Sequence, residues 1–68
     1  MDKELVLRNN LKDVRRVKNI SQEQLASLVG TTRQTIIAIE KGMFNPSAKL
    51  ALLLCVALDC NFEDLFYF

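Results

Sequence analysis

The stretch Ser21–Gly42, SQEQLASLVGTTRQTIIAIEKG, decides the fold, because it holds two short helix patterns separated by a glycine. The first helix begins at Ser21, whose hydroxyl can accept a hydrogen bond from the backbone N–H of Gln24 while the Gln24 side chain reaches back. Apolar residues then recur at the spacing that lines one helix face, and we expect all of them in the core: Leu25, Leu28 and Val29.

Gly30 follows directly, at the point where a helix end requires the left-handed backbone conformation that glycine adopts without steric cost. Thr31 or Thr32 caps the second helix, and we favour Thr32. Apolar side chains facing the core are expected at Ile36 and Ile39. Near the N-terminal end, the positions on or beside the opposite face are those of Arg33, Gln34, Thr35 and Ala38. Two short helices joined by a glycine turn match the helix-turn-helix unit, whose second helix enters the major groove of DNA.

Together with a later Asn-Pro-Ser and a leucine-rich run, this stretch resembles the Cro and lambda-repressor type (XRE-like) family of helix-turn-helix proteins. The resemblance runs from about Leu11 to Phe66. It implies an all-α fold, a compact five-helix lambda-repressor-like DNA-binding domain. Small stand-alone members such as the cytolysin repressor pair their termini as a two-stranded antiparallel ribbon. The β-prone runs ELVLR and LFYF are candidates for such a ribbon, although the first is equally compatible with a helical turn or a loose arm.

The composition describes one small domain, residues 1–68, with a net charge of +1. A chain of this length buries only about 60% of its unfolded surface, which favours additional burial against a partner subunit. Residues 1–20 carry six basic and three acidic side chains, whereas residues 46–68 carry one basic and three acidic. The basic segment, residues 1–20, therefore lies next to the helix-turn-helix stretch in the sequence. A solvent-exposed helix face explains the same charges without a nucleic-acid partner.

The remaining helices are expected on both sides of this unit. The first spans Leu11 to Lys18, with a stripe of Leu11, Val14 and Val17, a cap at Asn10 and an end at Asn19. After Pro46, a helix capped by Asn45 or Ser47 runs from Ser47 to Leu58 and is apolar nearly all round, which predicts burial on more than one side. A short last helix runs from Asn61 to Leu65 or Phe66.

The expected site residues fall into groups by role. Base reading is assigned to Arg33, Gln34 and Thr35, with Ile37 and Ala38 as apolar contacts to thymine methyl groups. The family resemblance assigns phosphate contacts to Gln22, Thr32, Lys41 and Asn45. The preference of helix N-termini for anions supports this assignment. The resemblance also implies a partly buried structural ion pair between Arg15 and Glu40. The seam of a homodimer is assigned to Leu52, Val56, Phe62, Phe66 and Phe68, with closure of the core as the alternative role of the aromatic residues.

These observations predict a cytoplasmic, dimeric transcriptional repressor that binds double-stranded DNA at a pseudo-palindromic operator through the helix from Thr32 to Lys41. The alternative is an antitoxin or accessory subunit whose apolar tail binds a protein. The residue inventory argues against an enzyme and indicates no cofactor, metal, small-molecule ligand or membrane span. Cys55 is expected to pack as a small hydrophobe, and a thiol sensor built from Cys55 and Cys60 requires the two sulfurs within reach.

Overall fold

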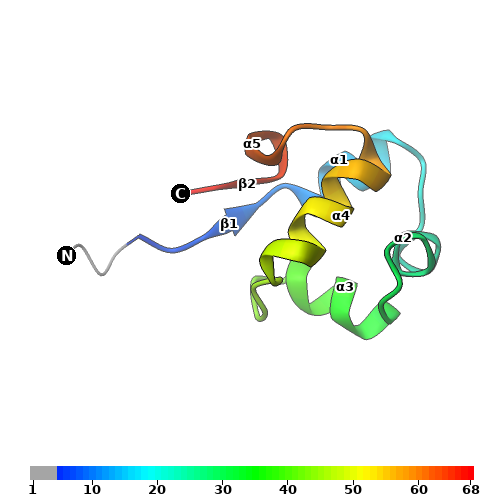
Figure 1. Cartoon of the computed structure of the whole chain (residues 1–68). Coiled ribbons are helices and arrows are strands. Elements are labelled where there is room, and N and C mark those ends of the chain that lie inside the picture. Colours follow the sequence, from blue (N-terminus) through cyan, green and yellow to red (C-terminus); the bar gives the residue numbers. More distant parts are fainter. Residues whose placement is uncertain (1–4) are drawn as a thin grey trace.

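The computed structural model describes residues 5–68, which form five helices and a two-stranded ribbon (Figure 1). In chain order the elements are β1 (Arg8–Asn9), α1 (Leu11–Val17), α2 (Gln22–Val29), α3 (Arg33–Glu40), α4 (Ala48–Leu58), α5 (Phe62–Leu65) and β2 (Phe66–Tyr67). The expected five-helix, lambda-repressor-like fold is confirmed. Within residues 5–68 the chain forms no helix long and apolar enough to cross a membrane.

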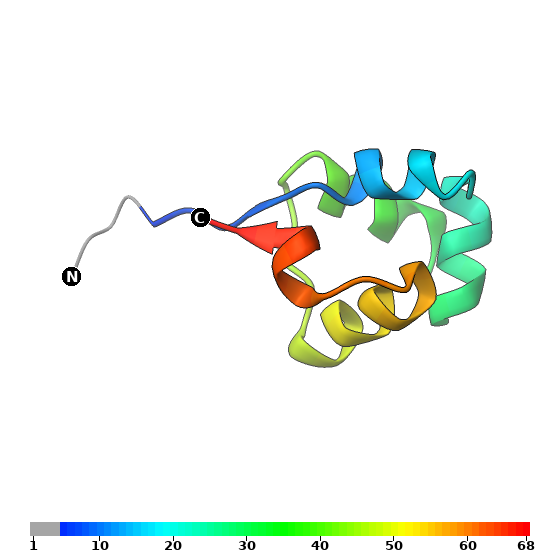
Figure 2. The ribbon, with the colours of Figure 1, turned by 90° about the horizontal axis from the view of Figure 1, so that it is seen from above.

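The terminal ribbon is also confirmed. Its strands are antiparallel, with Arg8 opposite Tyr67 and Asn9 opposite Phe66. The described segment before β1 and the C-terminal tail lie on the same side of the helical body (Figure 2). Only Arg8 of the expected run ELVLR takes part in the pairing, and Glu4 of that run lies outside the described residues. The Asn9 side-chain amide donates to the backbone oxygen of Ile39 over 2.9 Å, so the ribbon is tied to the end of α3.

The core lies where α2, α3 and α4 meet, with α1 and α5 closing it. The side chains with almost no solvent contact are aliphatic and come from every helix: Leu11, Leu25, Ile36, Ile39, Leu54, Leu58 and Leu65. Because these helices are short, most of their stability comes from this shared apolar packing.

Two apolar residues expected in the core are exposed. Leu28 is 63% exposed and Val17 is 83% exposed. On α2 the core face is centred between Leu25 and Val29, so the small side chain of Ala26 is buried while Leu28 falls at the edge of the stripe. On α1 the residue one turn after Leu11 is Arg15, which is buried and displaces the expected stripe.

The start of α1 also differs from expectation, whereas its end does not. Asn10 precedes the helix, but its side chain makes no capping hydrogen bond. The cap comes from Asn9, whose side-chain oxygen accepts from the backbone N–H of Leu11 over 3.1 Å. Asn19 follows the helix with a φ of 61°, the left-handed conformation expected there.

Helix α4 buries one side only. Ser47 is its N-cap, accepting from the backbone N–H of Leu50 over 3.1 Å. The expectation of burial on more than one side is wrong within a single chain, because Leu52 and Val56 remain exposed. Of the aromatic residues after α4, Phe66 is 4% exposed and belongs to the core, so it is not available for a dimer seam. Phe62 stacks on Phe66 with ring centroids 5.1 Å apart and stays partly exposed.

Candidate nucleic-acid interface

Helix α2 and the turn after it are held by backbone hydrogen bonds that their own residues supply. The backbone N–H of Ser21 donates to the Gln24 side-chain oxygen over 2.8 Å, and the N–H of Gln24 donates to the Ser21 hydroxyl over 3.0 Å. This is the reciprocal capping box that the sequence predicts. Gly30 ends the helix with a φ of 76°, as expected. Both ends of α2 are therefore set by short-range chemistry.

Thr32 starts α3 and is confirmed as its N-cap. Its hydroxyl accepts from the backbone N–H of Thr35 over 3.2 Å and lies 3.0 Å from the Thr35 hydroxyl. Ile36 and Ile39 point into the core and fix the rotation of the helix about its axis. This rotation decides which side chains of α3 face outward.

Of the five residues expected to read bases, Gln34, Ile37 and Ala38 lie farthest around α3 from Ile36 and Ile39, whereas Arg33 and Thr35 flank the buried side. Arg33 and Gln34 are exposed, while Thr35, Ile37 and Ala38 are half-buried. The helix thus presents a guanidinium, an amide and a hydroxyl near its N-terminal end, followed by methyl groups. Such a surface offers hydrogen bonds to base edges and apolar contact to thymine.

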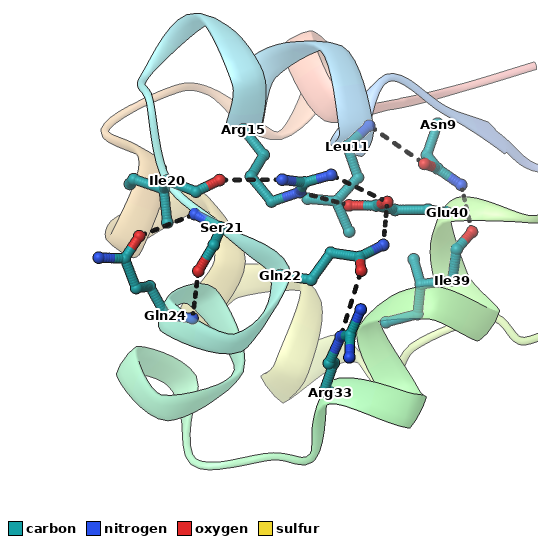
Figure 3. A network of polar contacts seen from close by, with 10 residues as sticks. All are labelled: Asn9, Leu11, Arg15, Ile20, Ser21, Gln22, Gln24, Arg33, Ile39 and Glu40. Carbon is teal, nitrogen blue, oxygen red and sulfur yellow. Dashed lines mark hydrogen bonds and ion pairs between the residues drawn. The ribbon is translucent and has the colours of Figure 1, made fainter.

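A polar network joins α1, α2 and α3 behind this surface (Figure 3). Arg15 and Glu40 form the expected ion pair, with 2.7 Å between Nε and Oε2, and their side chains are only 10% and 4% exposed. Arg15 also donates through Nη1 to the backbone oxygen of Ile20 over 2.9 Å. Gln22 Nε2 donates to Glu40 Oε1 over 3.0 Å, and Arg33 Nε donates to Gln22 Oε1 over 3.4 Å. Arg33, the first residue of α3, is therefore linked through Gln22 to the buried carboxylate of Glu40.

A basic hollow lies beside this network, where the N-terminus of α2 faces α1. It is open to solvent and has a volume of about 540 Å³. Its lining contains four basic side chains and one acidic side chain: Lys12, Arg15, Arg16, Ser21, Gln22, Glu23 and Arg33. Positive side chains at a helix N-terminus favour an anion such as a phosphate. Lys12 and Arg16 were not among the expected site residues, although the basic character of residues 1–20 was the signal for them.

The four residues expected to contact phosphate fall at the two ends of α3. Gln22 lies at the N-terminus of α2 within the network, and Thr32 caps α3. Lys41 and Asn45 are exposed at the other end, in the segment that leads to α4. The fold therefore places these residues on both sides of the residues expected to read bases instead of in one cluster.

Comparison with known proteins agrees with this geometry. A helix-turn-helix family model matches residues 11–65. An uncharacterized HTH-type transcriptional regulator of Methanocaldococcus jannaschii is 45% identical over 62 residues, which is 91% of this chain and 94% of the relative. YgzD of Bacillus subtilis, an uncharacterized regulator of the same type, is 46% identical over 61 residues, covering 90% of this chain and 92% of that protein.

A solved structure shows the same likeness. The restriction-modification controller protein C.AhdI from Aeromonas hydrophila is 37% identical and superposes with a TM-score of 0.75, covering 79% of this chain and 78% of that chain. The residues that the family model matches include the capped α2, the glycine turn and α3. The chain belongs to the helix-turn-helix family of transcriptional regulators, of the Cro and lambda-repressor (XRE-like) type.

Proposed function

We propose that this protein is a sequence-specific repressor that binds double-stranded DNA and reads bases through the N-terminal half of α3. The observation that carries the proposal is the outward position of Arg33 and Gln34 on a helix whose rotation is fixed by core residues. Arginine pairs bidentately with guanine in the major groove, and glutamine pairs with adenine. Thr35 adds a hydroxyl, and Ile37 and Ala38 add methyl contacts to thymine.

Phosphate contacts position this helix in the groove. Gln22 and Thr32 supply polar groups at the N-termini of α2 and α3, where the helix dipoles favour negative charge. Lys41 and Asn45 supply contacts at the other end of α3. The basic hollow supports the same role for Lys12 and Arg16, which line it beside Gln22. Such contacts set register and affinity, whereas the base contacts set specificity.

The base-reading assignment is tested by selecting bound sequences from random duplexes and then measuring affinity for variants. Arg33→Ala and Gln34→Ala are each expected to cost about 1–3 kcal/mol on the selected site and much less on random DNA. Lys18→Ala is a matched control for Arg33→Ala, because it also removes one exposed positive charge. The charge of Lys18 acts on Cys60, at the end of α4, so Lys18 belongs to a different part of the surface. Equal losses on both DNA types would make Arg33 a phosphate contact.

The salt dependence tests the phosphate contacts separately. Each neutralised phosphate adds about −0.9 to the slope of log affinity against log salt concentration. Lys12→Ala, Arg16→Ala and Lys41→Ala are each expected to make this slope shallower by about one phosphate contact. A flat response of the unmodified protein to salt would contradict DNA binding as its function.

We further propose that the repressor is a symmetric homodimer whose seam lies along α4 and α5. The exposed side of α4 carries Leu52 and Val56, and the exposed edge of Phe62 follows on α5. Phe68 in the C-terminal tail is also exposed. A second copy is the fitting partner, because one short reading helix contacts too few base pairs to be selective. Two-fold symmetry sets the two α3 helices about 34 Å apart, which predicts a pseudo-palindromic operator.

Sedimentation of matched variants tests the seam. Val56 is 78% exposed on α4, and Val56→Lys is expected to shift the protein to a monomer at micromolar concentration. Val17→Lys introduces the same charge at an equally exposed valine on α1 and is expected to leave the dimer intact. A monomeric unmodified protein, together with selected sites that lack dyad symmetry, would overturn the homodimer.

The direction of regulation needs a separate measurement. With the selected operator placed between the promoter elements of a reporter gene, the protein is expected to lower transcription. Arg33→Ala provides the control, because it should bind the operator weakly and restore expression. Increased transcription would make the protein an activator, while the DNA-binding surface would stay as described.

A further inference from the structure

The C-terminal end of α4 is closed by a pair of backbone hydrogen bonds. The N–H of Asp59 donates to the backbone oxygen of Val56 over 3.2 Å, and the N–H of Cys60 donates to the backbone oxygen of Cys55 over 3.1 Å. Asp59 has a φ of 52°, which turns the chain back on the helix. This is the Schellman motif, in which the residue after the left-handed position lies against the side chain in the last helical turn.

The two side chains that this motif brings together are cysteines. Apolar contact is usual at these two positions, which Cys55 and Cys60 occupy in this chain. Cys55 is buried against the core, whereas Cys60 is partly exposed, and both are free thiols. Both also line an open hollow of about 360 Å³ together with Val56, Asp59 and Asn61. Solvent therefore reaches the pair from one side, through Cys60.

We propose that Cys55 and Cys60 form a thiol–disulfide exchange site that takes a small disulfide, such as glutathione disulfide, and closes to an internal disulfide bond. In the first step the Cys60 thiolate attacks one sulfur of glutathione disulfide, which forms a mixed disulfide and releases one glutathione thiolate. In the second step the Cys55 thiolate attacks Sγ of Cys60, which forms the internal bond and releases the second glutathione thiolate. The two protein thiol protons pass to the released thiolates, so the protein loses two electrons and glutathione disulfide gains them.

The surroundings of the thiols set the rate of this exchange. Burial raises the pKa of the Cys55 thiol, as do the negative charges of Asp64 and Glu63, while contact with Cys60 lowers it. Burial also raises the pKa of the Cys60 thiol, as do Cys55, Asp64 and Asp59, whereas Lys18 lowers it. Because the thiolate is the attacking form, exchange should be slow at neutral pH and faster as the pH rises.

The bond would tie the last turn of α4 to the segment that leads into α5. It closes a loop of six residues, Cys55–Cys60, and so restricts the unfolded chain. Helix α3 is not part of this cap. The oxidised protein is therefore expected to melt at a temperature higher by on the order of 10 °C and to bind its DNA site with unchanged affinity.

Mass spectrometry of the full chain tests the proposal. After incubation with excess glutathione disulfide, the protein with both cysteines is expected to lose about 2 Da in mass. Without added reductant it should show no cross-linked chains, and its thiols should no longer react with an alkylating reagent. Cys55→Ala is expected to stop at the first step, with one glutathione bound at Cys60. Cys60→Ser is expected to remain unmodified, because the remaining thiol is buried.

Other outcomes overturn the exchange site. Three results for the protein with both cysteines would each show that the pair does not close. They are a glutathione that stays attached, chains cross-linked through Cys60, and thiols that still react with an alkylating reagent. The result on the unmodified protein decides the matter even if Cys55→Ala fails to fold. DNA affinity is measured on the same oxidised sample, and a change there would contradict the independence of this cap from α3.

Discussion

Replacing Glu40 by alanine should destabilise the protein strongly, because this carboxylate neutralises a buried cation. Glu40 accepts from Arg15 Nε over 2.7 Å, from Arg15 Nη2 over 3.3 Å and from Gln22 Nε2 over 3.0 Å. The backbone oxygen of Ile20 is the remaining partner of Arg15. In Glu40→Ala the guanidinium would stay buried with a single hydrogen bond and no counter-charge.

The expected size of the effect follows from this burial. Breaking a buried ion pair by removing one partner costs about 3–5 kcal/mol, compared with less than about 1 kcal/mol for an exposed pair. We expect about 3 kcal/mol for Glu40→Ala, the lower end of this range, because Arg15 lines the open basic hollow, from which water can reach its freed guanidinium. A domain of this length has a total stability of roughly 3–10 kcal/mol, so the variant should lose a third of it or more.

Urea unfolding followed by circular dichroism measures this loss. With a slope of about 1 kcal/mol per molar urea, the midpoint of Glu40→Ala should fall by about 3 M. Glu40→Gln keeps the shape and one acceptor and should lose less. The double variant Arg15→Met with Glu40→Leu removes both charges and should stay within about 1 kcal/mol of the unmodified protein. A loss below about 1 kcal/mol for Glu40→Ala would refute the reasoning, because the pair would then behave as if it were exposed.

Three further predictions concern the helix ends and the thiols. Ser21→Ala removes the acceptor for the backbone N–H of Gln24 and should cost about 1 kcal/mol in urea unfolding, and no loss would mean that water replaces the cap. Gly30→Ala should cost about 1–2 kcal/mol from backbone strain alone, because a Cβ at this φ of 76° would meet nothing within 4 Å, and a larger loss would indicate a clash. Burial raises the pKa of the Cys55 and Cys60 thiols above the ordinary 9.0. The protonated thiols therefore contribute to the free energy of unfolding below that pH, and this contribution is lost as the pH rises through the raised pKa values of the folded protein. Urea unfolding at several alkaline pH values should therefore show a steeper loss for the unmodified protein than for Cys55→Ala/Cys60→Ala, and parallel curves would contradict this.

The features that sequence alone determined depend on neighbours a few residues apart. The capping box of Ser21 and Gln24, the left-handed Gly30 and the cap at Thr32 each involve hydrogen bonds or dihedral angles within one helical turn. Local chemistry of this kind is visible in the order of the residues. The exposure of Gln34 follows from the same local reasoning, because Gln34 lies nearly opposite the buried Ile36 and Ile39, whereas Arg33 flanks them at the exposed start of the helix.

The resemblance to a known family supplied what local chemistry could not. The ion pair between Arg15 and Glu40 joins residues 25 positions apart, and no spacing rule connects them. The pairing of Arg8 with Tyr67 joins the two ends of the chain in the same way. Both contacts depend on how the intervening helices are arranged. The family resemblance implies that whole arrangement at once.

Only the tertiary structure decided which members of an apolar stripe are buried. Val17 and Leu28 fit the helical spacing but are exposed to solvent, whereas Phe66 in the C-terminal segment is buried in the core. Spacing defines a face to within about 100°, and the neighbouring helices select the part of that face that they cover. The link from Arg33 through Gln22 to Glu40 is likewise a product of packing, because its residues come from two helices that meet only in the folded chain.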